Sequence, residues 1–124
     1  MDAKTKDRSV EVEAKVRIEE KRIADLLITA LDGGSNYWAD LYGSLEDIMN
    51  GGTVSVVDAE TGESLGIVCY QSIATALQLM AKGEDRNGKK IPIRHWQAIV
   101  EENDDAETAD VFFQMAVMGE IVFG

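Results

Sequence analysis

TVSVVDAETGESLGIVCY, residues 53–70, decides the fold class of this chain. Two short runs, 53–57 and 65–70, are rich in β-branched residues, which favour strands. The loop between them, 58–64, has polar turn residues and a glycine, so the runs are predicted to pair as a hairpin. The sequence has no repeated strand–helix–strand pattern, which would have indicated a parallel sheet. We therefore expect an α+β fold in which helices pack on one face of a small antiparallel sheet.

Segments near both ends of the chain are also predicted to have a defined structure. Residues 9–18 alternate between apolar and charged side chains, which predicts a half-buried strand. The expected sheet is therefore the N-terminal strand plus the hairpin. Residues 1–8 are polar and expected to be disordered, which leaves 9–124 as a single α+β domain. Residues 120–123 are predicted to form a short strand or a docked apolar tail.

Helical spacing of apolar residues predicts four to five helices packed on the sheet. Their expected ranges are 19–32, 44–50, 71–82, 92–102 and 105–118. The side chains expected to face the core from the four longer helices are Ile23, Leu26, Leu27, Ala30 and Leu31; Ile73, Ala76, Leu77 and Met80; Ile93, Trp96, Ile99 and Val100; and Ala109, Phe112, Phe113 and Ala116.

Capping residues mark several helix ends. Gly33 follows the first apolar stripe and suits the residue just past the end of a helix. Ser44 with Asp47 predicts a capping box for the short helix, and Asp104 with Glu107 predicts one for the last helix.

Charge and composition limit the kind of partner. The 124 residues include 23 acidic and 12 basic ones, for a net charge of −11. Such a field repels phosphates and favours basic partners, so general nucleic-acid binding is not expected. A single cysteine indicates a reducing compartment. With neither a signal-peptide pattern nor an apolar membrane-spanning run in the sequence, a cytosolic protein is expected.

The stretch GGSNYW, residues 33–38, needs more than helix termination to explain it. Asn36, Tyr37, Trp38, Asp40 and Tyr42 gather hydrogen-bonding groups and flat apolar faces, and Tyr and Trp are enriched at interface hot spots. These five residues are the predicted binding site, by protein contact or by stacking on a base. The alternative is that the two aromatic residues pack back on the core, with the asparagine side chain holding the turn.

GGSNYW, the segment 72–81 and the closing stretch DAETADVFFQMAVMGEIVFG, 105–124, together resemble a group of small acidic proteins encoded by bacteriophages and prophages. Phe123 stands where that group would have tyrosine, and the loop at 83–94 is more basic than in the group. The resemblance implies a phage accessory protein that acts on host machinery, often by blocking a defence system through binding. It supplies no catalytic residues.

Two charged clusters have two interpretations each. Arg86, Lys89, Lys90 and Arg94 form the one basic island, which could hold a nucleotide phosphate or simply be solvated. The acidic run is Glu101, Glu102, Asp104, Asp105, Glu107 and Asp110. It could mimic nucleic-acid phosphates, but capping and compensation of the helix dipole explain it more simply.

A catalytic or metal site has little support in the sequence. Cys69 and His95 are the only thiol and imidazole, so a dyad would have to combine them, although a cysteine in an apolar β-run is usually buried and inert. One histidine and one cysteine supply no tetrahedral metal site. No catalytic residue, metal or cofactor is therefore predicted.

The sequence leaves three functions open. The preferred one is a non-enzymatic phage protein, in the host cytosol, that inhibits or redirects a host protein with a basic surface. The alternative is a sponge that captures a small nucleotide signal of host immunity, and the distant alternative is a Cys/His enzyme. A homo-oligomer, and in particular a homodimer, is expected on general grounds for so small a domain with candidate aromatic residues at its surface.

Overall fold

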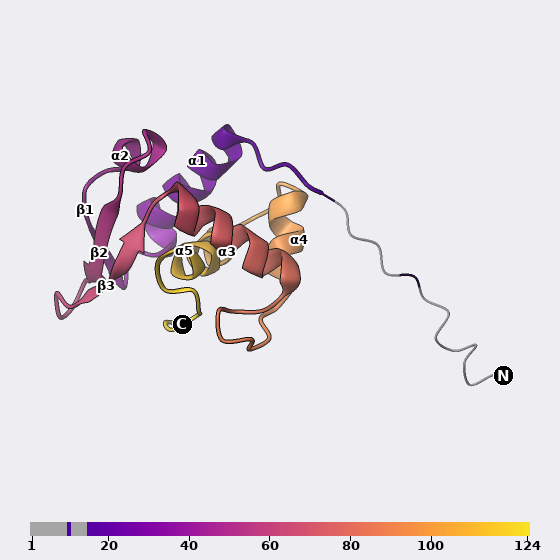
Figure 1. Ribbon diagram of the computed structural model, residues 1–124. Helices are drawn as coiled ribbons and strands as arrows, with labels where there is room; N and C mark the ends of the chain where they lie inside the picture. Colours follow the sequence, from indigo (N-terminus) through magenta and orange to yellow (C-terminus); the bar gives the residue numbers. More distant parts are fainter. Residues whose placement is uncertain (1–9, 11–14) are drawn as a thin grey trace.

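The computed structural model describes residues 10 and 15–124 of the chain (Figure 1). Its elements follow the order α1 (Glu20–Thr29), η2 (Ala30–Gly34), β1 (Ala39–Tyr42), α2 (Leu45–Met49), β2 (Val54–Asp58), β3 (Ser64–Val68), α3 (Tyr70–Lys82), α4 (Arg94–Val100) and α5 (Ala106–Met118). The expected α+β fold is confirmed. Figure 1 shows the three strands at one end of the molecule, with α3 and α5 beside them.

The sheet is antiparallel in the order β1-β2-β3. The predicted hairpin is β2–β3, with a register shift between Val56 and Val57. The third strand was predicted wrongly, because β1 and not the N-terminal segment occupies the other edge of β2. Four residues are too short for alternation to reveal, and β1 reaches β2 through the turn that follows η2. Residues 15–18 form no strand, and 9 and 11–14 lie outside the described residues, as do 1–8.

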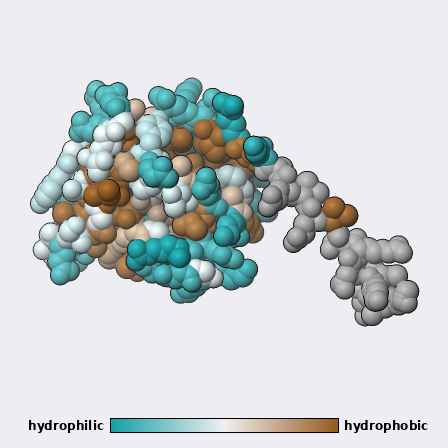
Figure 2. Space-filling model, in the orientation of Figure 1, coloured by the Kyte–Doolittle hydropathy of each residue, from teal (hydrophilic) through white to brown (hydrophobic). Residues whose placement is uncertain are grey.

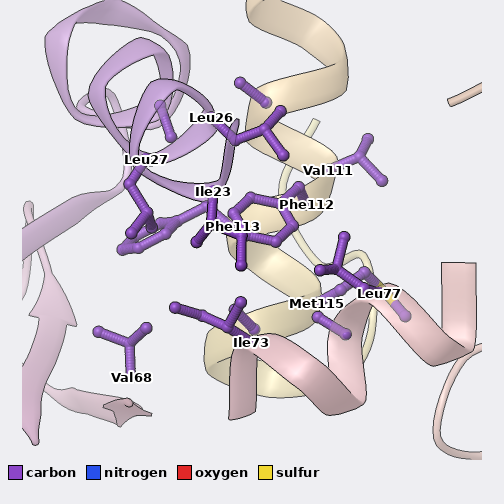
Figure 3. Packing of buried hydrophobic residues seen from close by; sticks show 14 of the residues in the cluster. Ile23, Leu26, Leu27, Val68, Ile73, Leu77, Val111, Phe112, Phe113 and Met115 are labelled. Atoms are coloured by element: carbon purple, nitrogen blue, oxygen red, sulfur yellow. The ribbon is translucent and has the colours of Figure 1, made fainter. Parts of the chain in front are cut away.

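Helix α5 is the centre of the core (Figure 3). It contacts α1, η2, α3, α4 and β3, and every residue from Thr108 to Ala116 is buried. The apolar stripes predicted for the first and third helices and for α5 are confirmed, with only Leu31 partly exposed. Burial on all sides means that the polar residues of α5 must find partners inside the protein.

Close packing of α5 on the sheet depends on Gly66. A Cβ atom at this position would lie 2.5 Å from the carbonyl oxygen of Val117, and the backbone φ of 152° also favours glycine. The glycine therefore lets β3 and the last turns of α5 approach one another, as strand glycines do where another backbone comes close.

The inward face predicted for α4 is partly wrong. Ile99 is buried and Trp96 partly buried as expected, whereas Ile93 and Val100 are exposed and His95 is buried instead. His95 can be inside because its Nδ1 lies 2.9 Å from the hydroxyl oxygen of Thr108 on α5. A buried polar side chain is tolerated when it is hydrogen-bonded, and hydropathy alone does not reveal that partner.

The predicted caps give mixed results. Ser44 and Asp47 form the expected capping box of α2. At α5 the cap is Asp105, whose carboxylate accepts from the backbone N–H of Thr108 2.9 Å away. Asp104 pairs with Arg22 of α1 instead. The error is one residue, and it arose because neighbouring acids offer equivalent capping groups.

Candidate functional site

The first helix does not stop at its glycines. α1 continues directly into η2, a single π-helical turn that includes Gly33 and Gly34 and is closed by a 2.7 Å hydrogen bond from Ser35 N–H to the Ala30 carbonyl. Gly33 lies inside this turn and has no positive φ, so the prediction that it follows the end of the helix is wrong. Such π-turns are rare and are frequently found at functional sites.

Gly34 explains why this turn lies against α5. A Cβ atom at Gly34 would come within 2.7 Å of the Ala106 carbonyl oxygen, whereas one at Gly33 would meet nothing within 4 Å. The second glycine therefore serves backbone-to-backbone packing, and the first does not.

A buried carboxylate holds the turn that follows. Asp110 of α5 accepts four hydrogen bonds, from Ser35 Oγ at 2.8 Å, Tyr37 Oη at 2.7 Å, Trp38 Nε1 at 2.7 Å and Gln114 Nε2 at 3.2 Å. No Lys, Arg or His in the described chain forms a salt bridge with Asp110. Neutral donors alone therefore compensate its charge. We call Ser35, Tyr37, Trp38, Asp110 and Gln114 the Asp110 network.

The same network holds the end of the chain. The side-chain oxygen of Gln114 accepts from the backbone N–H groups of Val122 and Phe123, and its Nε2 donates to the Phe123 carbonyl at 3.0 Å. The Phe123 ring stacks on Trp38 with a centroid separation of 5.1 Å. The tail is therefore docked and forms no strand. GGSNYW and the closing stretch meet in one structural unit.

The two aromatic residues of the turn have different roles. Trp38 is 2% exposed and packs between Phe113 and Phe123, so it belongs to the core. Tyr37 is 55% exposed, with its hydroxyl fixed on Asp110. Burial of that hydroxyl end, and then the hydrogen bond to the carboxylate, raise the pKa of Tyr37 to about 12. Of these two residues, only Tyr37 presents a rigid aromatic ring at the surface of the protein.

The other members of the predicted binding site are exposed. Asn36 and Asp40 line a hollow of about 270 Å³ between η2, β1 and α2. Tyr42 is 71% exposed and lies in a cross-strand row with Ser55 and Ile67, which are also exposed. This row lies on the side of the sheet opposite Val54, Val56 and Val68, which face the core.

The segment that supplies the strands carries only negative charge. From Ile23 to Ala81 the chain carries eight carboxylates and no Lys, Arg or His. This span includes all three strands and α2, which lie together in Figure 1. We call the exposed residues Asn36, Tyr37, Asp40, Tyr42 and Ile67 the sheet-end surface.

The basic island lies elsewhere and largely has its own partners. Arg86 pairs with Glu120 at 2.9 Å, Lys90 with Glu84 at 3.9 Å and Arg94 with Glu107 at 3.2 Å. Lys89 is exposed, and its backbone N–H donates to Asp85. No hydrogen bond or ion pair between described residues joins these cations to Tyr37 or Trp38.

The acidic run is distributed among several structural roles. Asp105 caps α5, Asp104 and Glu107 form ion pairs, and Asp110 is buried in its network. Backbone hydrogen bonding by Thr108 lowers the pKa of Asp105. Of the six acids, Glu101 and Glu102 are exposed and form no ion pair with a described residue.

The Cys69/His95 pair acquires no catalytic geometry. His95 is buried and bonded to Thr108, and burial, followed by the nearby Arg94 charge, lowers its pKa. Cys69 is partly buried before α3, with its backbone N–H bonded to Ser72 Oγ at 3.0 Å. No hydrogen bond within the described chain links the two. The described residues also include no group of three or more His, Cys, Asp or Glu side chains that could hold a metal ion.

Sequence reasoning missed Asp110 and Gln114 as the organising side chains. The available signal was their spacing, since two polar residues four apart interrupt an otherwise apolar run, Val111–Phe113 and Met115–Ala116. Polar residues in a helix buried on all sides require internal partners. Which donors they would meet depended on the tertiary fold.

Comparison with family models, curated proteins and solved structures found no match to this chain. Among the helices of the described residues, none has both the length and the apolar character needed to cross a membrane.

Proposed function

We propose that this chain is a non-enzymatic, phage-encoded binding protein that uses its sheet-end surface to engage, and so inhibit or redirect, a host protein with a basic surface. The phage origin rests on the resemblance of GGSNYW and the tail to small phage proteins. The observation that supports this surface is that the exposed rings of Tyr37 and Tyr42 belong to a segment, 23–81, that contains eight carboxylates and no basic residue.

Charge selects the class of partner. Asp40 lies on the exposed side of β1, and Asp58, Glu60 and Glu63 lie in and beside the hairpin loop. With no cation nearby in sequence to neutralise them, these carboxylates project a negative field that steers a basic surface toward this end. The same field disfavours nucleic acid.

Aromatic side chains would provide the affinity. Tyr42 is the most exposed aromatic ring of the described residues, and Ile67 adds apolar area in the same cross-strand row. Tyr37 is already held by its bond to Asp110, so it loses little conformational entropy on binding. Exposed Tyr side chains that are rigid before binding are typical interface anchors.

The test is a pull-down from host lysate followed by binding measurements with the purified partner. Tyr42→Ala combined with Asp40→Lys should weaken binding by about tenfold or more, since an anchor is lost and a charge is reversed. Val100→Ala combined with Glu101→Lys is the matched control, because both residues are exposed at α4 and carry the same kinds of change. Equal binding by the two double variants, or a partner without a basic surface, would contradict the proposal.

A different measurement distinguishes nucleotide capture from protein binding at the sheet-end surface. A sponge would show a rise in melting temperature with a nucleotide of its class, and that rise would be lost in Arg86→Ala or Arg94→Ala. Protein binding at the sheet-end surface predicts no rise across a nucleotide panel. Trp38→Ala is unsuitable for either test, because it removes a core side chain.

A further inference from the structure

An apolar groove lies beside the segment that leads into α1. Its volume is about 840 Å³, within the range of about 300–1,000 Å³ that is usual for small-molecule sites. The segment 15–18 and the helices α1, α3 and α4 contribute its larger apolar side chains, which are Val16, Ile18, Ile23, Ile73, Leu77 and Trp96. Figure 2 shows brown, apolar surface next to the point where the N-terminal segment leaves the domain. Apolar surface gathered in one place indicates a binding site.

The groove extends along the whole of α3. The α3 residues that line it begin with Tyr70, the first residue of the helix, and end with Lys82, the last. A rise of 1.5 Å per residue makes this length roughly 18 Å. Between the two ends, every lining side chain of α3 except Gln78 is apolar. An occupant that uses this length should therefore contain an extended apolar chain.

The charge of the groove is opposite to that of the protein. Among the described residues, Lys15 and Lys82 are the charged ones that line it, and no carboxylate does so. The chain as a whole has a net charge of −11. Lys82 has an ion-pair partner, Glu84, at 3.9 Å, but that carboxylate is not part of the lining. A ligand that complements the groove should therefore carry a negative charge.

The groove has few other polar side chains. The Tyr70 hydroxyl donates to the sulfur of Met49 at 3.8 Å, and a thioether is a weak acceptor. Among the described lining residues, Gln78 is the one amide. A ligand rich in polar atoms, such as a nucleotide, would leave most of them without partners here, and unpaired polar groups are costly to bury. The lining therefore favours a ligand with one charged head and an otherwise apolar body.

We propose that this groove binds a free single-chain carboxylate of the fatty-acid class. Its hydrocarbon chain lies along α3 against Ile73 and Leu77, and its carboxylate is held by the lysines that line the groove. The length, the apolar lining and the positive charge each have a counterpart in such a molecule. No residue of the sheet-end surface lines the groove, so this inference is independent of the proposed function.

The test is calorimetric titration of the full chain with dodecanoate, below the concentration at which it forms micelles. We expect a dissociation constant below about 1 mM, the limit for a ligand of this size with ordinary affinity per atom. Octanoate, which is four methylene groups shorter, should bind at least about tenfold more weakly, because less apolar surface is buried. Dodecyltrimethylammonium has the same chain and a positive head, and should also bind at least about tenfold more weakly.

Trp96 reports where the ligand binds. It lines the groove, whereas the other tryptophan, Trp38, is 2% exposed and packed in the core. Dodecanoate should shift the fluorescence of Trp96 to shorter wavelength by excluding water from the ring. In Trp96→Phe the calorimetric binding should persist while the fluorescence shift is lost.

A pair of neighbouring residues on α3 provides a matched test of the site. Ala74 lines the groove and Thr75 does not, and both are exposed. Ala74→Glu places a carboxylate in the groove and should weaken dodecanoate binding by about tenfold or more. Thr75→Glu adds the same charge to the same helix outside the groove and should bind like the wild type.

The lysines are tested in the same way. Lys15→Glu with Lys82→Glu should weaken dodecanoate binding by about tenfold or more. The matched control is Lys89→Glu with Lys90→Glu, which changes the net charge equally at exposed residues outside the groove. Lys90 is also a good match for Lys82, because each lies 3.9 Å from Glu84. Circular dichroism should show that all variants are folded, and Ala74→Glu tests the site if a lysine variant is not.

Three results would overturn the proposal. The first is binding of dodecanoate that is weaker than about 1 mM. The second is equal affinity for dodecanoate and dodecyltrimethylammonium, since the charge of the groove would then select nothing. The third is equal binding by Ala74→Glu and Thr75→Glu, as expected if the groove accepts a protein segment instead and dodecanoate binds elsewhere. None of these outcomes bears on the sheet-end surface.

Discussion

Replacing Asp110 by alanine should be the most damaging single change in the GGSNYW region. The carboxylate accepts from Ser35 and Trp38, which are buried, and from Tyr37, whose hydroxyl can turn to water. Gln114 keeps its second bond, to the Phe123 carbonyl. Two buried donors are thus left without partners.

The size of the effect follows from those two donors. A buried donor without an acceptor costs about 1–3 kcal/mol. Removing the buried charge offsets part of this cost, whereas losing hydrogen bonds to a charged acceptor adds to it. We therefore expect the free energy of unfolding to fall by about 3–5 kcal/mol. For a chain of 124 residues this lowers the melting temperature by about 10–20 °C. Because Trp38 is one of the two donors, its fluorescence should report the same transition.

Chemical denaturation with circular dichroism measures the effect, and two variants interpret it. Asp110→Asn keeps one oxygen for Ser35 and Trp38 but presents an N–H₂ group to Gln114, so it should cost only about 1–2 kcal/mol. Asp40→Ala removes an exposed carboxylate that forms no ion pair with a described residue, and should change stability by less than about 0.5 kcal/mol. If Asp110→Ala costs no more than Asp40→Ala, the network does not stabilise the turn.

Three further predictions concern single side chains. Gly34→Ala should destabilise by about 1–3 kcal/mol in denaturant titration, because its Cβ would meet the Ala106 carbonyl oxygen at 2.7 Å, whereas Gly33→Ala should be neutral or stabilise by up to about 1 kcal/mol; equal effects would contradict the packing argument. Burial lowers the pKa of His95, so below pH 6.5 the unfolded state takes up a proton that the folded state resists, and stability should fall as the pH falls. His95→Gln should flatten that slope in melts between pH 7.5 and 5.5 (about one unit either side of the unperturbed value), and an unchanged slope would assign it to other groups. The pKa of Tyr37 is raised to about 12 from 10.0. The protonated hydroxyl therefore contributes fully to the stability of the fold below pH 10, and this contribution is lost as the pH rises toward 12. Ultraviolet titration against Tyr37→Phe should show this tyrosine titrating last, and earlier in Asp110→Asn; identical titrations of wild type and Asp110→Asn would mean that the carboxylate does not raise the pKa of Tyr37.

Several errors of sequence reasoning have one physical origin. The inward position of His95, the cap at Asp105 and the roles of Gly33 and Gly34 all depend on what another element presents at that point. In each case a local rule offered two near-equal choices. A partner distant in sequence then decided between them.

The sequence by itself determined the hairpin and the inward faces of α1, α3 and α5. Period-2 and helical spacing report which side of a segment is apolar, so the hairpin and the stripes of α1, α3 and α5 could be predicted without a structure. Charge patterning likewise needs no coordinates, since the chain from Ile23 to Ala81 has no basic residue in any conformation.

Only the tertiary structure decided how GGSNYW is used. The sequence alone did not distinguish Tyr37 from Trp38, because either ring could pack in the core or lie on a contact surface. Asp110, more than 70 residues away, accepts from both, and α5 with the docked tail covers one ring and leaves the other exposed. Burial depends on which distant residues arrive on each side of a chain, and local sequence patterns carry no information about that.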